Sequence, residues 1–281
     1  MRERIIDFGN GFWNIRGSFK LGGLIEIGTQ ASLVRLSDGR FVMLDSYTIP
    51  RELLAELDQI TGGRDNVVAV INLHPFHTLH SEAMHEDFPN ARHFGTSRHL
   101  RKYPDLGWEK TTTEDLVIGT EFAEDLDFSL PAGVELVPAN ENIHCGSILA
   151  YHRASKTIHV DDTFNLRGAK KGKPGKLSVH LTLGAALEDR PGAASDFRDW
   201  GASITERWSG AQRICVAHAG VMTAEKLGEP SVNVAMKAAV PAFLILVIWL
   251  LAQPFYINST ISQMIPESSG SEGSSLALVM A

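Results

Sequence analysis

The sequence predicts an α/β fold, on three observations. Residues 66–72 (NVVAVIN) form a continuous apolar run, typical of a strand that is buried on both faces. Residues 50–60 precede it with the spacing of an amphipathic helix. Strand-like and helix-like segments then alternate through both halves of the chain, which indicates α/β layers rather than a helical bundle or an all-β sandwich.

The first half begins with a predicted hairpin. Residues 32–36 (SLVRL) and 41–44 (FVML) flank Asp38-Gly39, a dipeptide that favours a tight turn between two strands. The helix that follows has one apolar face and ends at Gly62-Gly63; that face consists of Leu53, Leu54, Leu57 and Ile60. After the buried strand we expect a short helix over residues 78–87 and a brief strand over residues 91–94.

The second half predicts further strands and two helices. The strands are expected over residues 134–138, 147–151, 157–160 and 213–217. The helices are expected over residues 195–208 and 223–227, with Gly228 and Pro230 ending the second.

Composition limits the class of protein. The 281 residues are 44% hydrophobic and 21% charged, which is ordinary for a folded domain, and the length suits one large domain or two small ones. The formal charge of −7 argues against a general nucleic-acid binder. A basic stretch at residues 167–176 (RGAKKGKPGK) contains Gly and Pro and reads as a solvated loop. The only two cysteines, Cys145 and Cys215, suit a reducing compartment.

The two ends of the chain differ. The first residues have no long apolar region, so we expect no secretory signal and a cytoplasmic location. Residues 238–252 are all apolar, and the segment 238–257 is long enough to cross a bilayer. It is interpreted either as a membrane anchor or as a buried terminal helix. The expected organisation is therefore a domain over residues 1–237, this apolar segment, and a disordered tail over residues 258–281. The oligomeric state is not indicated.

Clustered histidines predict a metal site. Four of the eleven histidines fall within twelve residues, directly after the buried strand: His74, His77, His80 and His85. Neutral imidazole is a good ligand for zinc or iron, and metal sites need several such groups from converging elements. The alternative is a polar helix start on the surface that happens to use histidine. Further His and Asp residues stand at other predicted strand ends, where α/β proteins place their sites: His144, Asp161, Asp162 and His218.

The order of these pieces resembles the metallo-β-lactamase superfamily, over roughly residues 5 to 235. The matching segments are Met43-Leu44-Asp45, the run from His74 to His80, His144-Cys145-Gly146-Ser147, Val160-Asp161-Asp162-Thr163-Phe164 and Val216-Ala217-His218. The resemblance implies a four-layer αββα sandwich, here followed by a C-terminal apolar helix. It also implies one metal held by His74, His77 and His144, a second held by His80 and His218, and Asp162 as the bridging, catalytic carboxylate. The cofactor would be one or two zinc ions, with iron or manganese as alternatives.

Two departures from the family's His-x-His-x-Asp-His motif change the expected chemistry. The motif is one residue longer here, and Leu79 stands where the family has an aspartate that binds the second metal. We therefore expect one well-bound ion and a weaker or absent second. The implied function is a hydrolase that opens an ester, thioester, lactone or similar bond of a small molecule through a metal-bound hydroxide. The alternative is a non-catalytic protein of the same fold that acts as a binding or membrane-tethered module.

Other enzyme classes lack their signatures. No Gly-x-Ser-x-Gly elbow is present for a serine hydrolase, and no glycine-rich phosphate loop leads from a strand into a helix. Cys145 and His144 are adjacent, so in a strand their side chains would point to opposite faces and would not share a proton unless a turn intervenes.

Overall fold

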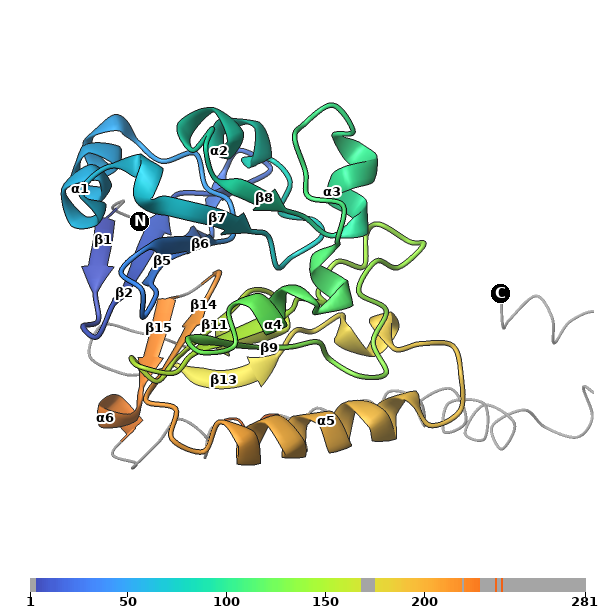
Figure 1. The fold of residues 1–281 in the computed structure, drawn as a ribbon. Coiled ribbons are helices and arrows are strands. Elements are labelled where there is room, and N and C mark those ends of the chain that lie inside the picture. The colour runs from blue at the N-terminus through green and yellow to red at the C-terminus, as the bar shows by residue number, and fades with distance from the viewer. Residues whose placement is uncertain (1–3, 168–174, 219, 228–235, 237–238, 240–281) are drawn as a thin grey trace, which may run out of the picture. The chain divides into compact units, whose positions relative to one another are not determined.

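A computed structural model of the chain describes residues 4–167, 175–218 and 220–227, together with Met236 and Ala239. In this part of the chain two β-sheets pack face to face, and helices cover the outer side of each sheet (Figure 1). The arrangement is the predicted four-layer αββα sandwich.

The first sheet has the strand order β1-β2-β5-β6-β7-β8. Its strands are β1 (Arg4–Asp7), β2 (Phe12–Gly17), β5 (Thr29–Arg35), β6 (Phe41–Leu44), β7 (Val67–Ile71) and β8 (Arg92–Phe94). The first four are antiparallel, whereas β6, β7 and β8 run parallel. A small hairpin of β3 (Lys20–Leu21) and β4 (Ile25–Glu26) lies between β2 and β5 in the chain.

The second sheet has the order β15-β14-β11-β10-β9. Its strands are β9 (Leu126–Ser129), β10 (Leu149–His152), β11 (Thr157–Val160), β14 (Arg213–Val216) and β15 (Gly220–Thr223). Only the central pair, β11 and β14, is parallel, so both strands end at the same edge. A separate hairpin consists of β12 (Phe164–Arg167) and β13 (Lys176–Val179).

The described helices are α1 (Arg51–Thr61), α2 (Ser81–Asp87), α3 (Ser97–Lys102), α4 (Ile118–Glu121), α5 (Ala193–Arg207) and α6 (Ala224–Leu227). Three 3₁₀ turns lie at Arg64–Asn66, Thr113–Asp115 and Leu183–Ala186.

Helix α1 follows from its apolar spacing. It buries Leu54 and Leu57 in a core between the first sheet and helices α1 and α2, and it ends at Gly62, whose φ of 73° is a left-handed conformation that glycine adopts without strain. Met84 and Phe88, from α2 and the residue after it, complete this core.

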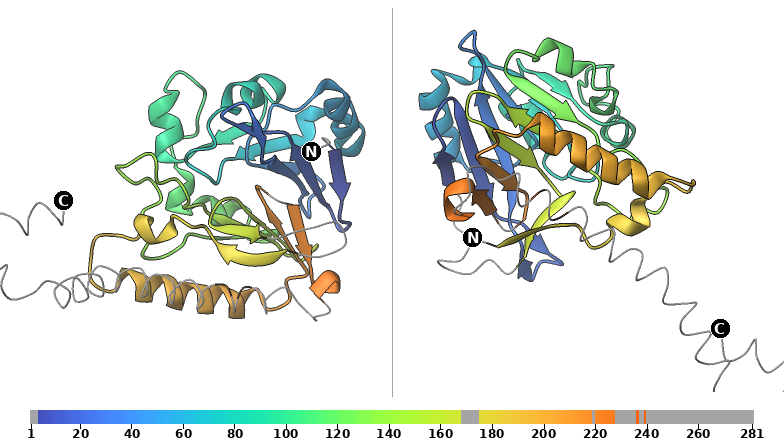
Figure 2. Two further views of the ribbon diagram at one scale, coloured as in Figure 1. Left: turned by 180° about the vertical axis from the view of Figure 1, so that it is seen from behind. Right: turned by 90° about the horizontal axis from the view of Figure 1, so that it is seen from below.

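Helix α5 covers the outer face of the second sheet (Figures 1 and 2). The Nε1–H of Trp200 donates to Ser129 Oγ at 2.8 Å, and that of Trp208 donates to Asp127 Oδ2 at 2.7 Å. The Trp208 ring also stacks on Tyr151, with ring centroids 5.5 Å apart. The two indoles thus bury their apolar area and still satisfy their donors.

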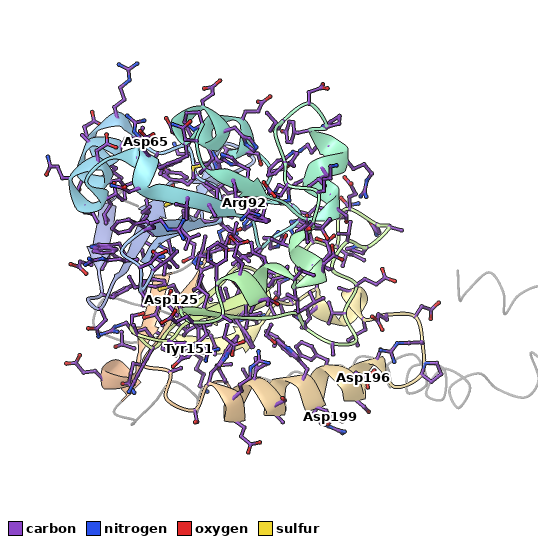
Figure 3. All side chains as sticks on the ribbon, viewed as in Figure 1. Asp65, Arg92, Asp125, Tyr151, Asp196 and Asp199 are labelled. Atoms are coloured by element: carbon purple, nitrogen blue, oxygen red, sulfur yellow. The ribbon has the colours of Figure 1, made fainter. Side chains whose placement is uncertain are left out.

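Side chains fill the space between the two sheets (Figure 3). Most of this core is apolar, with Phe12, Val34 and Ile71 from the first sheet against Leu126 and Ala150 from the second. The strands that line this core also deliver the site, because β6, β7, β11 and β14 each lead into a polar segment where they end.

Several predicted elements are confirmed with small shifts of their ends: the hairpin of β5 and β6, helices α1, α2 and α5, and strands β7, β8, β10, β11 and β14. The predicted strand at residues 134–138 is wrong. Val134 makes only an isolated bridge with Leu187, and a Cβ at the neighbouring Gly133 would meet the Ala193 backbone, so this stretch is a packed loop.

The strongly apolar segment 238–257 lies outside the described residues except for Ala239, as does the tail 258–281. Among the described residues, no helix is both long enough and apolar enough to span a bilayer. Most of the basic stretch also lies outside them, but its two ends, Arg167 and Lys176, are cross-strand partners in the β12–β13 hairpin.

Candidate metal centre

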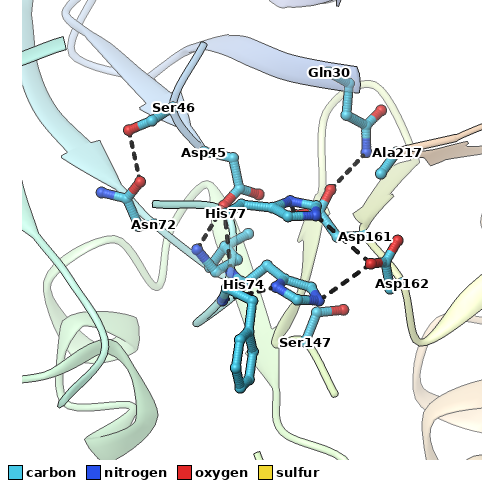
Figure 4. Close-up of polar contacts among 12 residues, drawn as sticks. Gln30, Asp45, Ser46, Asn72, His74, His77, Ser147, Asp161, Asp162 and Ala217 are labelled. Carbon is cyan, nitrogen blue, oxygen red and sulfur yellow. Dashed lines mark hydrogen bonds and ion pairs between the residues drawn. The ribbon is translucent and has the colours of Figure 1, made fainter. Parts of the chain in front are cut away.

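Three histidines converge on the carboxylate of Asp162. His74 Nε2 lies 3.4 Å and His77 Nε2 3.6 Å from Asp162 Oδ2 (Figure 4). His218 Nε2 lies 3.2 Å from Asp162 Oδ1. The four residues come from the segments after β7, β11 and β14, so both sheets contribute. His74 and Asp162 are buried, while the side chains of His77 and His218 are 22% and 21% exposed, which leaves one side of the cluster open to solvent.

The second ring nitrogens of two of these histidines are fixed by hydrogen bonds. His77 Nδ1 lies 3.0 Å from Asp161 Oδ2, and His218 Nδ1 lies 2.6 Å from the Gly28 carbonyl oxygen. Both partners are acceptors, so each Nδ1 carries the proton and donates it. The Nε2 lone pair of each neutral ring therefore faces an anionic carboxylate. Either a proton or a metal cation between the groups stabilises such an arrangement, and a histidine whose second nitrogen is oriented by a carboxylate or carbonyl is the usual design of a metal ligand.

The pKa values of the same groups are shifted in the direction that these contacts favour. Burial disfavours charge on His77, but the charges and hydrogen bonds of Asp161 and Asp162 outweigh it and hold the pKa well above 6.5. Burial also opposes protonation of His218, yet its contact with Asp162 raises its pKa. Burial would raise the pKa of Asp162, but the contacts with His218 and His77 hold it well below 3.8. Protons thus occupy the positions that a metal cation would neutralise.

His74 differs from the other two histidines. The Phe76 backbone N–H donates to His74 Nδ1 at 3.1 Å, so neutral His74 carries its own proton on Nε2, facing Asp162. Burial, followed by the charge of His77, lowers the His74 pKa to about 3. His74 can ligate through Nε2 only if that proton moves and the Phe76 hydrogen bond is given up. His77, Asp162 and His218 are therefore the best-prepared ligands, with His74 as a fourth.

A second group of acidic and histidine side chains lies behind the first. Asp45 Oδ2 is 2.8 Å from His159 Nε2, which is 3.8 Å from Asp161 Oδ1. These three residues also have metal-ligand chemistry, but their polar atoms already have partners: Asp45 Oδ1 accepts the Leu73 N–H at 2.7 Å, and His159 Nδ1 pairs with Ser32 Oγ at 2.9 Å. The group therefore acts as a hydrogen-bonded support for the first.

Two of the predicted ligands lie elsewhere. The His80 ring is hydrogen-bonded to Thr48 Oγ1 at 2.8 Å and packs edge-on against Tyr47. His144 is exposed, with its Nδ1 3.3 Å from the Glu141 carbonyl oxygen and its ring beside Phe76. Leu79 is 66% exposed. Within the described residues the structure thus brings together His74, His77, Asp162 and His218, but not His80 or His144.

The remaining parts of the site could not be predicted from the sequence, because the pattern did not show that these residues are buried. His159 lies inside β11 and reads as part of an ordinary strand, and Arg16 and Gln30 alternate with apolar residues as solvent-facing positions do. All three are buried in the structure.

Comparisons with known proteins by sequence and by structure give different results. No curated protein matches the sequence. A family model described as a phosphate ATP-binding cassette transporter matches residues 231–281, less than a fifth of the chain and almost all outside the described residues.

Solved structures resemble the chain over most of its length. A metallo-β-lactamase from Pontibacter korlensis is 12% identical, with a TM-score of 0.55 over 85% of this chain and 99% of that one. One from Erythrobacter litoralis with β-mercaptoethanol in its active site is 11% identical, with a TM-score of 0.56 over 85% and 96%. FIM-1 from Pseudomonas aeruginosa in its mono-zinc form is 10% identical, with a TM-score of 0.54 over 86% and 96%. The chain therefore has the metallo-β-lactamase fold, with His and Asp side chains gathered at the ends of its central strands.

Proposed function

We propose that the protein is a metal-dependent hydrolase that binds one metal ion through His77, Asp162 and His218, with His74 as a fourth ligand. One observation carries the proposal: the Nε2 atoms of two imidazoles, each ring oriented by a hydrogen bond from its Nδ1, face one ionised carboxylate. Two histidines and a carboxylate are a common catalytic set for zinc and for non-haem iron.

The second metal position of the family is the weak part of the site. Leu79 offers no ligand atom, and His80 is held by Thr48 and Tyr47. We therefore propose one ion. The competing function is that of a non-catalytic protein of the same fold. The absence of a ligand atom at Leu79 and the position of the His80 ring favour it.

The chemistry divides between the ion and the residues around it. A bound divalent cation supplies a Lewis acid that polarises a carbonyl or phosphoryl oxygen and lowers the pKa of water. Asp162, whose low pKa keeps it ionised at neutral pH, serves as an anionic ligand rather than as a proton donor. Asp161 and the Gly28 carbonyl hold the His77 and His218 rings in the orientation that ligation requires. The solvent-exposed side of His77 and His218 is where a small-molecule ester, thioester or lactone would enter.

The test combines metal content with turnover. The full-length chain is purified, its zinc, iron and manganese are measured by elemental analysis, and hydrolysis of a panel of esters, thioesters, lactones and phosphoesters is followed before and after chelation. We expect about one metal per chain, and activity that is lost in chelator and restored by one metal. His218→Ala should lose both, whereas the exposed His144→Ala should keep both. Full metal content without turnover of any substrate supports the non-catalytic alternative, and a metal-free chain refutes both the ion and the hydrolase.

We further propose that residues 238–257 contact a membrane. The apolar composition of this segment supports the proposal, as does the match of residues 231–281 to a transporter family model. Flotation of the full chain with phospholipid vesicles tests it, with a variant lacking residues 238–257 as the control. Equal recovery of both proteins in the vesicle fraction would contradict the proposal.

A further inference from the structure

Four polar side chains form a buried row between the two sheets, next to the metal centre. We call Asn14, Arg16, Gln30 and Ser32 the inter-sheet polar row. Asn14 pairs with Ser32 and Arg16 with Gln30 across β2 and β5, and all four side chains are 2% exposed or less. The next pair on the same face, Phe12 and Val34, belongs to the apolar core. The face that β2 and β5 turn toward the second sheet thus changes from apolar to polar within one step.

Arg16 reaches across to the strand that leads to His218. Its Nη1 donates to the Val216 carbonyl oxygen at 2.8 Å, and its Nη2 donates to that of Ala217 at 2.7 Å. These are the two carbonyl groups directly before His218. The planar guanidinium can bridge them at once, which fixes the direction in which the chain leaves β14.

Gln30 makes the corresponding connection to His77. Its Oε1 accepts from Arg16 Nη1 at 3.0 Å, and its Nε2 lies 2.9 Å from the Val160 carbonyl oxygen and 3.3 Å from Asp161 Oδ1. Asp161 Oδ2 in turn accepts a hydrogen bond from the Nδ1–H of His77. An unbroken series of contacts therefore runs from Arg16 through Gln30 and Asp161 to the His77 ring.

Burying this row between the two sheets costs free energy. Arg16 is 1% exposed, its hydrogen-bond acceptors among the described residues are neutral oxygens, and its Nε–H has no partner among them. A buried cation without a directly paired carboxylate costs free energy that an apolar side chain would not. Packing alone therefore does not explain an arginine at this position.

We propose that Arg16, acting with Gln30, is a positioning residue of the metal centre, which holds His218 and the His77–Asp161 pair in place from the opposite sheet. The inference rests on the proposed metal-binding function, because it assigns the row a role toward that ion. It concerns residues on β2 and β5, which contribute no ligand.

The experiment compares zinc affinity in four full-length proteins: wild type, Arg16→Met, Arg16→Lys and the control Phe12→Leu. Phe12 lies on the same strand and the same face, so its truncation disturbs the sheet interface without touching the row. Zinc dissociation constants are measured by competition with a chromophoric chelator, and unfolding by urea in parallel. We expect Arg16→Met to weaken zinc binding by about 10- to 100-fold, as loss of an outer support typically does. Arg16→Lys should fall between, and Phe12→Leu should lower stability with little change in affinity.

A double-variant cycle separates positioning from general damage. In a His218→Ala background, adding Arg16→Met should weaken the residual zinc binding less than it weakens binding in wild type, because the part of its effect that passes through His218 is already absent. An unchanged affinity in Arg16→Met, or an equal loss in Arg16→Met and Phe12→Leu, overturns the proposal.

A second readout needs no metal. Long-range ¹H–¹⁵N spectra of the metal-free proteins report which nitrogen of His218 carries the proton. We expect an ordered Nδ1–H signal in wild type and in Phe12→Leu, and a shifted or broadened signal in Arg16→Met and Arg16→Lys. A wild type that binds no zinc refutes the proposed function, and these spectra alone then decide whether Arg16 positions His218. Identical spectra in all four proteins overturn the positioning role.

Discussion

Asp161 and Asp162 contact opposite nitrogens of the His77 ring: Asp161 Oδ2 lies 3.0 Å from Nδ1, and Asp162 Oδ2 lies 3.6 Å from Nε2. Consecutive residues at the end of β11 thus have different tasks. One orients the ring from behind, and the other faces the position of the ion. Asp161 and Asp162 lie in the bend and turn directly after β11, and this turn lets two adjacent aspartates contact both nitrogens of one imidazole.

This division predicts different results for two conservative variants. Asp162→Asn should abolish tight metal binding, because it removes the anionic ligand. Asp161→Asn should weaken binding by about 10- to 100-fold, because it loosens the ring but leaves the ligand atoms in place. Metal competition titrations measure both, with the exposed Asp38→Asn as the control. Equal losses for the two variants would mean that both carboxylates coordinate the ion.

The placement of the histidines gives a second prediction. His80→Ala and His144→Ala should retain the metal content of the wild type, since neither ring reaches the cluster in the described structure. His77→Ala and His218→Ala should reduce it to a small fraction. Elemental analysis after gel filtration is the measurement. Loss of metal in His80→Ala without loss of folding would show that His80 turns inward when the ion binds.

Histidine burial predicts a third result, the response of stability to acid. Burial lowers the pKa of His152 from 6.5 to about 4; its Nδ1 is paired with Ser155 Oγ and its ring stacks on Phe12. The unfolded chain therefore takes up this proton first as the pH falls. The stability that the neutral ring provides is complete above about pH 6.5 and is lost as the pH falls toward about 4, by roughly 3 kcal/mol for one such group.

Urea unfolding in chelator between pH 4 and 7 checks this. The slope of unfolding free energy against pH should be positive in that range and smaller in His152→Gln, by up to one proton. The exposed His144→Gln serves as the control. A slope that is unchanged in His152→Gln would mean that the buried ring does not titrate with unfolding.

A closely packed glycine, Gly17, gives the fourth prediction. A Cβ on Gly17, at the end of β2, would overlap the Tyr47 ring and the Thr29 methyl group. Gly17→Ala should therefore destabilise the protein by about 1 to 3 kcal/mol, the usual cost of overpacking, and displace Tyr47 from its contact with His80. Gly107→Ala, where nothing lies within 4 Å of the added atom, is the matched control. Urea denaturation should show a loss for Gly17→Ala alone.

The sequence was sufficient for the parts of the fold that have regular periodicity. Residues 66–72 predicted β7 because their side chains are apolar on both faces, and residues 50–60 predicted α1 from its single apolar face. The short strands β1 and β2 were missed, because a half-polar strand such as β2 looks like a surface segment until its partner sheet is known.

The candidate site was predictable where residue type alone indicates chemistry. His77, Asp162 and His218 stand at strand ends in the sequence and meet in the structure. Spacing could not show that His80 would turn toward Thr48, since the direction of its ring depends on Tyr47 and Thr48, more than thirty residues earlier. The inter-sheet polar row was equally hidden, because only the packing of one sheet on the other converts its polar side chains from exposed to buried.

The wide separation of the ligands along the chain has a consequence for folding. His77, Asp162 and His218 meet only after β7, β11 and β14 have all been placed, so the unfolded chain has no preformed site. An ion held by all three would act as a reversible cross-link that closes two long loops, as a disulfide does. The free metal concentration would then set the free energy of unfolding, because each tenfold increase above the dissociation constant adds about 1.4 kcal/mol to stability.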